Sequence, residues 1–384
     1  MIKFPIELQS GSSIVSVNSM IELSKQHEID LICFKFNNEE FLKPDYINNL
    51  TVVKSDIKKP FFLSKFLLTL VGTPPSISVF SSKLMRRKIQ ELTSLNSYDR
   101  ILLFELSAMQ YINRDNYRKV IINIEDPQSL KLWRLSKLKI WSSFQAIRIK
   151  LLSLSTYLYE IKILHQASKV LLLSHADVLD FRKIHKLTNL VHVPYGITPK
   201  KTEKLRSYSE REQAIVYTGN MFHPANIDGA LFLINEIMPI LLAKEPGVVL
   251  WIVGAEPDQK IKEAAKLFPK NIVVTGRVAS VSDYLERAKV SVCPILLSIG
   301  VQTKVLEAMS LGTPVVSTSA GNSGINGIDG QELHVCDDPN IFALKICRLI
   351  NGIDWQDFSI RGRDKVLREF SWEKSARILN KYLQ

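Results

Sequence analysis

Short apolar runs alternate with amphipathic stretches along the first half of the chain. The runs have the length of buried strands, at residues 28–34, 100–104, 120–124 and 170–173. Apolar positions recur at helical spacing in residues 14–25, 82–92, 129–166 and 176–184. Strands that alternate with helices predict a parallel sheet with helices on both faces. Residues 198–212 are polar and lack apolar periodicity, which predicts a linker.

The alternation restarts after the linker and predicts a second α/β unit. Strands are expected at 214–218, 248–253, 272–275, 290–293 and 314–317, and helices at 227–243, 258–266, 281–287 and 302–310, with several more from residue 340 to the end. Two doubly wound units joined by a linker make a cleft, and ligands bind such sheets at the carboxyl ends of their strands. Four glycines follow predicted strands: Gly219, Gly254, Gly276 and Gly300. The plain alternative to a role in ligand binding is that these glycines only turn the chain.

Residues 290–318 form the most informative segment, a strand, a loop with Gly300, a helix and another strand. Lys304 and Glu307 are three residues apart and therefore share one face of the helix start. A helix N-terminus attracts anionic oxygens, an ammonium can meet a phosphate, and a carboxylate can accept hydrogen bonds from ribose hydroxyls. The segment therefore suits a nucleotide diphosphate. The alternative is a plain ion pair on a helix packed in an α/β domain.

Charge is divided unequally along the 384 residues. The net charge is +12, with 28 Lys and Arg against 17 Asp and Glu in residues 1–200, and 22 against 21 in the remainder. A basic half suggests an anionic partner such as a membrane surface, a phosphorylated lipid or nucleic acid. Nucleic acid is disfavoured because no recognition motif for it is present. The alternative is a solvated basic surface without a specific partner.

The cellular compartment of the protein is predicted from three patterns that the sequence lacks. Four scattered cysteines form no C-x-x-C pair, no signal-peptide pattern opens the chain, and no uncharged apolar run reaches 18 residues. We therefore expect a cytoplasmic protein without a membrane span.

Residues 129–166 mix Trp and Leu with Lys and Arg. Such a stretch can lie on an anionic bilayer, because interfacial helices combine these residue types on opposing faces. The alternative is a long cross-domain helix with its apolar stripe in the core and its cations in solvent. Residues 61–71 present the same choice. A membrane contact would make the protein peripheral at the inner face of the cytoplasmic membrane.

Four segments of the second half, in order, resemble the retaining GT-B glycosyltransferases of the family 4 (group 1) type, in the branch that assembles bacterial polysaccharides. They are YTGNMFHPANIDGALFLINEIMP (217–239), VVLWIVGAEP (248–257), VVTGRVASVSDYLERAKVSVCP (273–294) and GVQTKVLEAMSLGTPVVST (300–318). The last is similar to the family pattern GxxxKxxEAMAxGxPVVxT. The first half matches more loosely, through FPIELQSGSS (4–13) and LVGTPPSISVFSSKLMRRKI (70–89).

The resemblance implies a fold and a division of the chain. The fold class is α/β, GT-B, with two Rossmann-like doubly wound domains facing a cleft. The implied parts are an acceptor-binding domain at 1–197, a nucleotide-sugar-binding domain at 198–365, and a helix at 366–384 that crosses back to the first domain.

The resemblance also implies roles for single residues. Glu307 would hold ribose hydroxyls, and Lys304 with the backbone around Gly300 would hold the diphosphate. The donor site would be completed by Gly219, Asn220, Arg277, Val278, Ser298, Val301, Gln302 and Thr303, with Arg277 and Val278 at the nucleobase. Gly11 and Ser12 would cap the diphosphate from the other domain.

The chain departs from the family pattern at three places. The second glutamate expected at position 299, which normally holds donor-sugar hydroxyls, is Ile299. Asn220 and Ala225 stand where basic residues are usual, and Gln302 stands where relatives often carry Lys. Sugar recognition would then use backbone amides near residues 298–301 or other groups. Lys304 and helix N-termini would compensate most of the phosphate charge, with Arg277 or His223 as further candidates.

The implied reaction transfers a sugar from a UDP- or GDP-sugar to a saccharide or lipid-linked saccharide, with retention, in capsule, exopolysaccharide or lipopolysaccharide synthesis. No cofactor is expected, and no metal, because no D-x-D motif is present. Asp126 and His175 are candidates to touch the acceptor, although each also suits a structural role. Two alternatives stay open: a GT-B sugar-nucleotide epimerase, and a GT-B protein that binds nucleotide or lipid without turnover.

Overall fold

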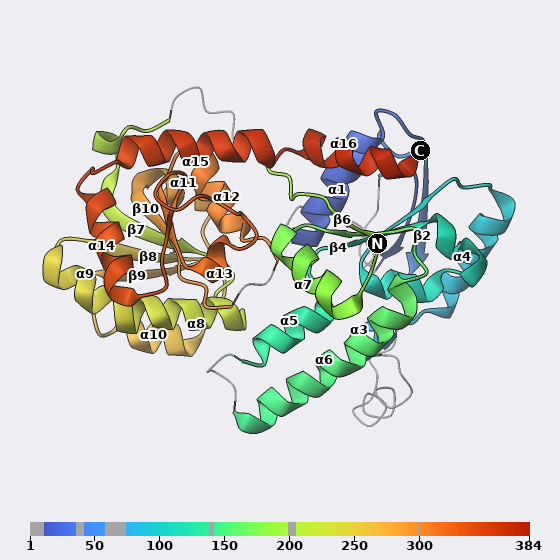
Figure 1. The fold of residues 1–384 in the computed structure, drawn as a ribbon, viewed down its shortest axis with the longest axis horizontal. Helices are drawn as coiled ribbons and strands as arrows, with labels where there is room; N and C mark the ends of the chain where they lie inside the picture. The colour runs from blue at the N-terminus through green and yellow to red at the C-terminus, as the bar shows by residue number, and fades with distance from the viewer. Residues whose placement is uncertain (1–10, 36–41, 58–73, 138–141, 199–204, 298–299) are drawn as a thin grey trace. The chain divides into compact units, whose positions relative to one another are not determined.

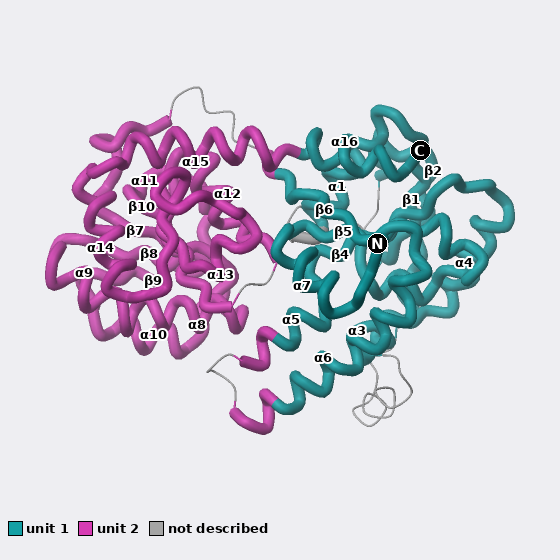
Figure 2. The backbone as a smooth tube through the Cα atoms, viewed as in Figure 1, with its two compact units in different colours: residues 1–133, 147–196, 372–384 teal, residues 134–146, 197–371 magenta. Residues whose placement is uncertain are grey.

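The chain folds into two compact units (Figures 1 and 2). The computed structural model describes residues 11–35, 42–57, 74–137, 142–198, 205–297 and 300–384. Unit 1 comprises Met1–Trp133, Ile147–Gly196 and Trp372–Gln384, and unit 2 comprises Arg134–Ala146 and Ile197–Ser371. The expected boundary between residues 365 and 366 falls inside helix α15 (Trp355–Glu369), and the chain returns to unit 1 at Trp372.

Unit 1 is built on parallel strands. A four-stranded sheet has the order β3-β4-β5-β6, and β1 pairs in parallel with β2. The strands are β1 (Asp30–Lys35), β2 (Asn49–Lys54), β3 (Ile101–Phe104), β4 (Val120–Ile124), β5 (Lys169–Leu172) and β6 (Leu190–His192). The helices are α1 (Gly11–Leu23), α3 (Pro75–Ser78), α4 (Lys83–Leu95), α5 (Gln128–Leu135), α6 (Ser143–Leu164), α7 (His175–His185) and α16 (Trp372–Leu383), with short 3₁₀ turns η1 (Leu106–Tyr111) and η2 (Arg114–Lys119).

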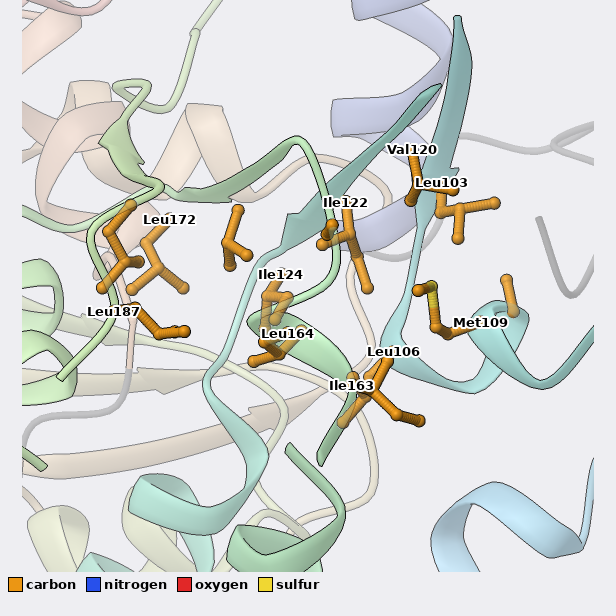
Figure 3. Packing of buried hydrophobic residues seen from close by; sticks show 14 of the residues in the cluster. Leu103, Leu106, Met109, Val120, Ile122, Ile124, Ile163, Leu164, Leu172 and Leu187 are labelled. Carbon is orange, nitrogen blue, oxygen red and sulfur yellow. The ribbon is translucent and has the colours of Figure 1, made fainter. Parts of the chain in front are cut away.

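The core of unit 1 lies on the strands that the apolar runs predict. Val120, Ile121 and Ile122 of β4 are fully buried because a central parallel strand is covered on both faces. Figure 3 shows Ile122 and Ile124 of β4 beside Ile163 and Leu164 from the end of α6. Strands β2 and β6 are absent from the sequence prediction. β6 is three residues long and β2 has polar ends, so neither gives an apolar run.

The long helix expected at 129–166 is two helices, α5 and α6, separated by residues 136–142. Residues 138–141 lie outside the described part of the chain. The start of α6 has a local cause. Ser142 N–H donates to Gln145 Oε1 (3.0 Å), and Gln145 N–H donates to Ser142 Oγ (3.3 Å), which is the reciprocal capping arrangement of a helix N-terminus. The pair Ser142-x-x-Gln145 was therefore a sequence signal for the break.

Unit 2 contains a six-stranded parallel sheet of order β12-β11-β10-β7-β8-β9. Its strands are β7 (Glu212–Thr218), β8 (Val249–Val253), β9 (Ile272–Gly276), β10 (Ala288–Cys293), β11 (Val315–Ser317) and β12 (His334–Val335). Its helical segments are η3 (Tyr208–Glu210), α8 (Pro224–Phe232), a π-helical stretch (Leu233–Ile237), α9 (Met238–Lys244), α10 (Gln259–Ala265), α11 (Val281–Arg287), α12 (Thr303–Ser310), α13 (Ser319–Asn322), α14 (Pro339–Ile350) and α15. Figure 1 shows α11, α12 and α15 on one side of this sheet and α8, α9 and α10 on the other.

One helical run of unit 2, Pro224–Lys244, is long and apolar enough to cross a membrane. It joins α8, the π-helical stretch and α9, and its residues Leu233, Ile234, Ile237 and Leu241 are fully buried in the unit. α9 and the π-helical stretch both pack against α14. Its apolar composition is therefore explained by its place in the core.

The end of the expected linker is part of the fold. Arg211 is 5% exposed, and its guanidinium donates to the carbonyls of Leu285, Ala288 and Leu311 and to Thr313 Oγ1. It also lies 5.0 Å from the ring centroid of Trp355. The prediction of a linker across 198–212 is wrong at Arg211, because one buried guanidinium gives no periodic pattern. Residues 199–204 lie outside the described part.

Candidate functional site

The carboxyl ends of β7, β8 and β9 meet at one edge of the unit 2 sheet, and a glycine stands at each. Gly219 N–H donates to Val253 O (3.0 Å), and Gly254 N–H donates to Gly276 O (3.2 Å). A Cβ on Gly254 would lie 1.7 Å from Gly219 O, so the backbones approach closely only because that residue is glycine. These glycines do more than turn the chain, since they bring three strand ends together.

Lys304 lies directly over the Gly219 turn. It stands in the first turn of α12, and its Nζ would be 3.0 Å from a Cβ on Gly219. The ammonium lies 4.5 Å from the ring centroid of the buried Tyr217, over the π face that attracts a cation. Burial lowers the pKa of Lys304, with Cys293 and Glu307 opposing the shift. Glycine at 219 thus leaves room for a cation at the carboxyl end of β7.

Asn226 holds the lysine, and the sequence analysis missed it. Lys304 Nζ donates to Asn226 Oδ1 (2.8 Å), and Asn226 Nδ2 donates to Asn220 O (2.9 Å). Tyr217 Oη also reaches Asn226 O at 3.3 Å. The sequence signal was a polar residue, Asn226, in the first turn of the helix α8 that follows the predicted strand 214–218, two positions after Pro224. Asn220 itself contributes its carbonyl, and its side chain is exposed.

Glu307 lies one helical turn after Lys304. Protein surrounds it densely enough for desolvation to raise its pKa, with Lys304 opposing the shift, yet the side chain remains open to solvent. Within the described part of the chain, no hydrogen bond or ion pair engages its carboxylate. The ion pair considered as the plain alternative is not formed, because the lysine donates to Asn226 instead. A carboxylate of this kind can accept hydrogen bonds from a ligand.

The loop before α12 reaches the helix N-terminus at Gln302 and Thr303. Gly300 has φ 61°, a left-handed conformation that glycine adopts freely, and the backbone of Gly300 and Val301 packs on Gly324. The first N–H groups of α12 have no intrahelical acceptor and suit an anion. Ser298 and Ile299 lie outside the described residues, so their predicted roles stay predictions.

Arg277 and Val278 follow β9, the edge strand of the same sheet. Arg277 is exposed, and Val278 is partly buried. Among the described residues, no hydrogen bond or ion pair joins Arg277 to Lys304 or Asn226. Both residues therefore lie at the carboxyl end of a strand of the same sheet whose strand β7 ends below Lys304.

Among the described candidates of unit 1, no hydrogen bond or ion pair joins Asp126 to His175. Gly11 and Ser12 begin α1, and their predicted loop lies mostly in residues 1–10, outside the described part. Asp126 follows β4 and forms an ion pair with Lys131 (Nζ to Oδ2, 2.7 Å). His175 follows β5, is exposed, and lies 5.6 Å from the ring of His192.

Two further carboxylates, both missed from the sequence, stand at the ends of β3 and β4. Glu105 has φ 125°, which costs a non-glycine residue about 1–3 kcal/mol. Burial raises the pKa of Glu105, and it raises the pKa of Glu125 to about 8, with Glu105 and Asp126 adding to the shift. The sequence could have indicated both carboxylates by their position, because each directly follows a predicted strand.

This shift predicts how the stability of unit 1 depends on pH. Between the ordinary pKa of 4.5 and about 8, folded Glu125 holds a proton that the unfolded chain has lost. The free energy of unfolding should therefore fall as pH rises through this window, by at most about 1.4 kcal/mol per pH unit from this group. Urea unfolding at pH 5.5, 7 and 8.5 measures it. Glu125→Gln should flatten the dependence and the exposed control Glu91→Gln should not; an unchanged slope in Glu125→Gln would refute the assignment.

Comparison with known proteins places a glycosyltransferase family match on unit 2, the unit that holds Lys304 and Glu307. Residues 212–352 match the family model described as "Glycosyl transferases group 1", and this span contains Gly219, Asn226, Lys304 and Glu307. A Klebsiella pneumoniae protein described as "Uncharacterized 44.6 kDa protein in cps region" is 29% identical over 147 residues. That match covers 36% of this chain and 37% of the relative's length.

Solved structures extend the similarity to the fold of nearly the whole chain. Sucrose-phosphate synthase from Thermosynechococcus elongatus matches with a TM-score of 0.69 at 15% identity, over 97% of this chain and 92% of that one. Anabaena HepE in complex with UDP-glucose matches with 0.66 at 12% identity, over 97% and 96%. A Staphylococcus aureus TarM variant in complex with UDP and saccharide ligands matches with 0.61 at 15% identity, over 78% of this chain and 58% of that one.

The expected fold class is confirmed. Both units are α/β with parallel sheets, and the structural neighbours are GT-B glycosyltransferases. At identities of 12–15% these neighbours establish the fold alone. The family match to residues 212–352 supports an enzyme of the glycosyltransferase class.

Proposed function

We propose that the chain transfers a sugar from a nucleotide-diphosphate sugar to a saccharide or lipid-linked saccharide acceptor. One observation carries the proposal: the Lys304 ammonium lies over Gly219 and, among the described residues, has no carboxylate partner, while the Glu307 carboxylate one turn away accepts no hydrogen bond from them. This pairs a cation for a diphosphate with an acceptor for ribose hydroxyls. UDP- or GDP-sugars are the proposed donors, and structural neighbours of the chain are described in complex with UDP or UDP-glucose.

The residues of the site would divide the work. Breaking the bond between the sugar C1 and the phosphate oxygen leaves charge on the diphosphate, which Lys304 and the N–H groups of α12 would stabilise in place. The acceptor oxygen forms the new bond to C1, and its proton passes to the departing phosphate oxygen. Front-side attack of this kind retains the anomeric configuration and needs no separate base. Retention is proposed from the family resemblance.

The acceptor is proposed to belong to cell-surface polysaccharide synthesis. Support comes from the Klebsiella relative, whose description places its gene in a cps region. Asp126 and His175, at the carboxyl ends of β4 and β5, are the proposed acceptor-side residues of unit 1. The absent glutamate at position 299 leaves sugar recognition, in this proposal, to backbone amides near residues 298–301 or to other groups.

A donor panel distinguishes this activity from its two alternatives. The full chain is incubated with UDP-glucose, UDP-galactose, UDP-N-acetylglucosamine and GDP-mannose, with and without a lipid-linked saccharide extract. Release of one nucleoside diphosphate that depends on the extract, with an α-linked product by NMR, is expected from these α-linked donors. A C2 epimer of the donor without release identifies an epimerase. Binding of nucleotide with neither product identifies a protein without turnover.

Asn226 is proposed to position Lys304, and its replacement has a distinct expected result. In Asn226→Ala the ammonium loses its acceptor, so we expect donor affinity to fall about ten- to a hundredfold, because a hydrogen bond to a charged group is worth about 1.5–3 kcal/mol. Calorimetric titration with the donor identified by the panel measures this. The exposed control Asn340→Ala should leave affinity unchanged, and equal affinities in all three proteins would remove Asn226 from the site.

A further inference from the structure

Helix α6 carries an apolar stripe that the described fold leaves exposed. The stripe consists of Phe144 (78% exposed), Ile147 (57%), Leu151 (60%), Leu154 (53%) and Leu158 (58%). These residues are separated by three, four, three and four positions, so they lie along one face of the helix over about 21 Å. We call them the α6 stripe.

The stripe is distinct from the face of α6 that forms the core. Tyr159, Ile163 and Leu164 pack into the core of unit 1, and Figure 3 shows Ile163 and Leu164 there. On the buried side, Glu160 Oε2 accepts from His185 Nε2 (2.9 Å), and Ser153 Oγ donates to Ser129 O (2.7 Å). The end of α6 is therefore fixed to unit 1 while the stripe stays exposed; four of its residues belong to unit 1, and Phe144 belongs to residues 134–146 of unit 2. The expectation that the apolar residues of this stretch are core is wrong for the stripe.

Cations and an aromatic ring flank the stripe. Arg148, Lys150 and Lys162 are exposed. Lys150 Nζ lies 5.9 Å from the ring centroid of Trp133, a residue of α5 that is 45% exposed. In α5 and α6 the one acidic residue is Glu160, and it is fully buried. Within the described parts of α5 and α6, the stripe is therefore flanked by cations and by no exposed acidic side chain of these two helices.

Charge selects among the possible occupants. A second copy seated on the stripe would bring cations against cations on both flanks, which opposes pairing of two identical helices. A planar anionic surface would receive the stripe in its apolar layer, the flanking cations at its head groups, and Trp133 at the boundary between them. Cations lie on both sides of the stripe and beside α5. This distribution of charge fits a planar anionic surface better than a single acidic helix of a partner protein.

We propose that the α6 stripe and Trp133 dock this chain on a membrane surface that contains anionic lipid. The proposal rests on α6 and does not depend on the proposed transfer activity. It implies that apolar and electrostatic contributions act together, so removal of either weakens binding.

Co-sedimentation of the full chain with vesicles tests the docking. Vesicles of phosphatidylcholine alone are compared with vesicles containing 30 mol% phosphatidylglycerol, a composition that we choose as roughly that of an anionic membrane. Binding to the anionic vesicles is expected to be at least about tenfold stronger than binding to the neutral ones. It should weaken in 0.5 M salt, because the Debye length there is on the order of a few ångströms and charge attraction is screened. Equal binding to both, or none to either, would overturn the proposal.

Two variants assign the binding to α6. Leu151→Ser with Leu154→Ser should weaken binding about tenfold, and so should Arg148→Glu with Lys150→Glu. Matched controls in unit 2, Leu267→Ser and Lys260→Glu with Lys262→Glu, alter equally exposed side chains and should bind as wild type. Wild-type affinity in the stripe variants would contradict the docking.

Other occupants of the stripe give different results in the same variants. A fall in thermal stability of Leu151→Ser with Leu154→Ser would mean that the chain itself covers the stripe. A concentration-dependent dimer of the wild type that these substitutions dissolve would mean that a second copy covers it. Retention of an acidic amphipathic peptide together with failure to bind anionic vesicles would mean a protein partner. Each of these outcomes overturns the membrane proposal.

Discussion

Lys304→Met is expected to lower kcat/KM for sugar transfer by about 10²–10³, the cost of removing one preorganised charge-stabilising group from an active site. The same substitution should leave thermal stability unchanged or raise it. Burial lowers the pKa of Lys304, which means that the fold holds its charge at a cost, and methionine has similar length without the charge. Initial rates with the identified donor and a thermal melt of each protein measure both effects.

The combination separates a catalytic role for Lys304 from a structural one. A structural lysine would lose stability and activity together. The control Lys260→Met removes an exposed lysine of α10 and should change neither quantity. If Lys304→Met retained wild-type kcat/KM, the ammonium over Gly219 would have no part in the reaction.

Arg211→Met is expected to destabilise unit 2 by about 3–5 kcal/mol. The guanidinium donates to the carbonyl of Leu285 in the last turn of α11 and to those of Ala288 and Leu311, which directly follow α11 and α12, and truncation leaves these acceptors without this donor. Burial lowers the pKa of Arg211 to about 10, so the site is desolvated, and the hydrogen bonds offset that cost. Urea unfolding of the full chain, followed by the fluorescence change of the unit 2 transition, measures the difference.

An exposed arginine provides the matched control for this loss. Arg361 is 54% exposed at its side chain and lies 3.9 Å from Asp357. Arg361→Met should change the free energy of unfolding by less than about 0.5 kcal/mol, as surface substitutions usually do. A change of similar size in Arg211→Met would show that the carbonyls find other donors.

Most strands of the four- and six-stranded sheets could be predicted, β6 and β12 excepted, because central parallel strands read as short apolar runs. β4 matches its predicted range, and β7, β8 and β10 differ from theirs only at one end. The same pattern fixed where the strands end, and therefore where Gly219 and Gly254 lie. Two-residue β12 has no such run, and its pairing with β11 depends on the completed sheet.

The candidate site could be predicted only as far as local spacing reaches. Lys304 and Glu307 share a helix start, so their proximity follows from the sequence. The contact of Lys304 with Asn226 joins residues 78 positions apart and depends on how β7 and β10 pair. Periodicity likewise predicted an apolar face on α6 without indicating which part of it the fold would leave uncovered.

Calorimetric titration of the full chain with UDP, GDP, ADP and CMP tests the central claim most directly, that the edge of the unit 2 sheet around Lys304 and Glu307 binds a nucleoside diphosphate. We predict that UDP or GDP binds one-to-one, that Lys304→Met weakens binding at least about tenfold, and that Glu307→Gln weakens it because the amide lacks the negative charge and has one acceptor oxygen in place of two for the ribose hydroxyls. Binding of none of the four nucleotides, or binding that both variants leave unchanged, would contradict the account.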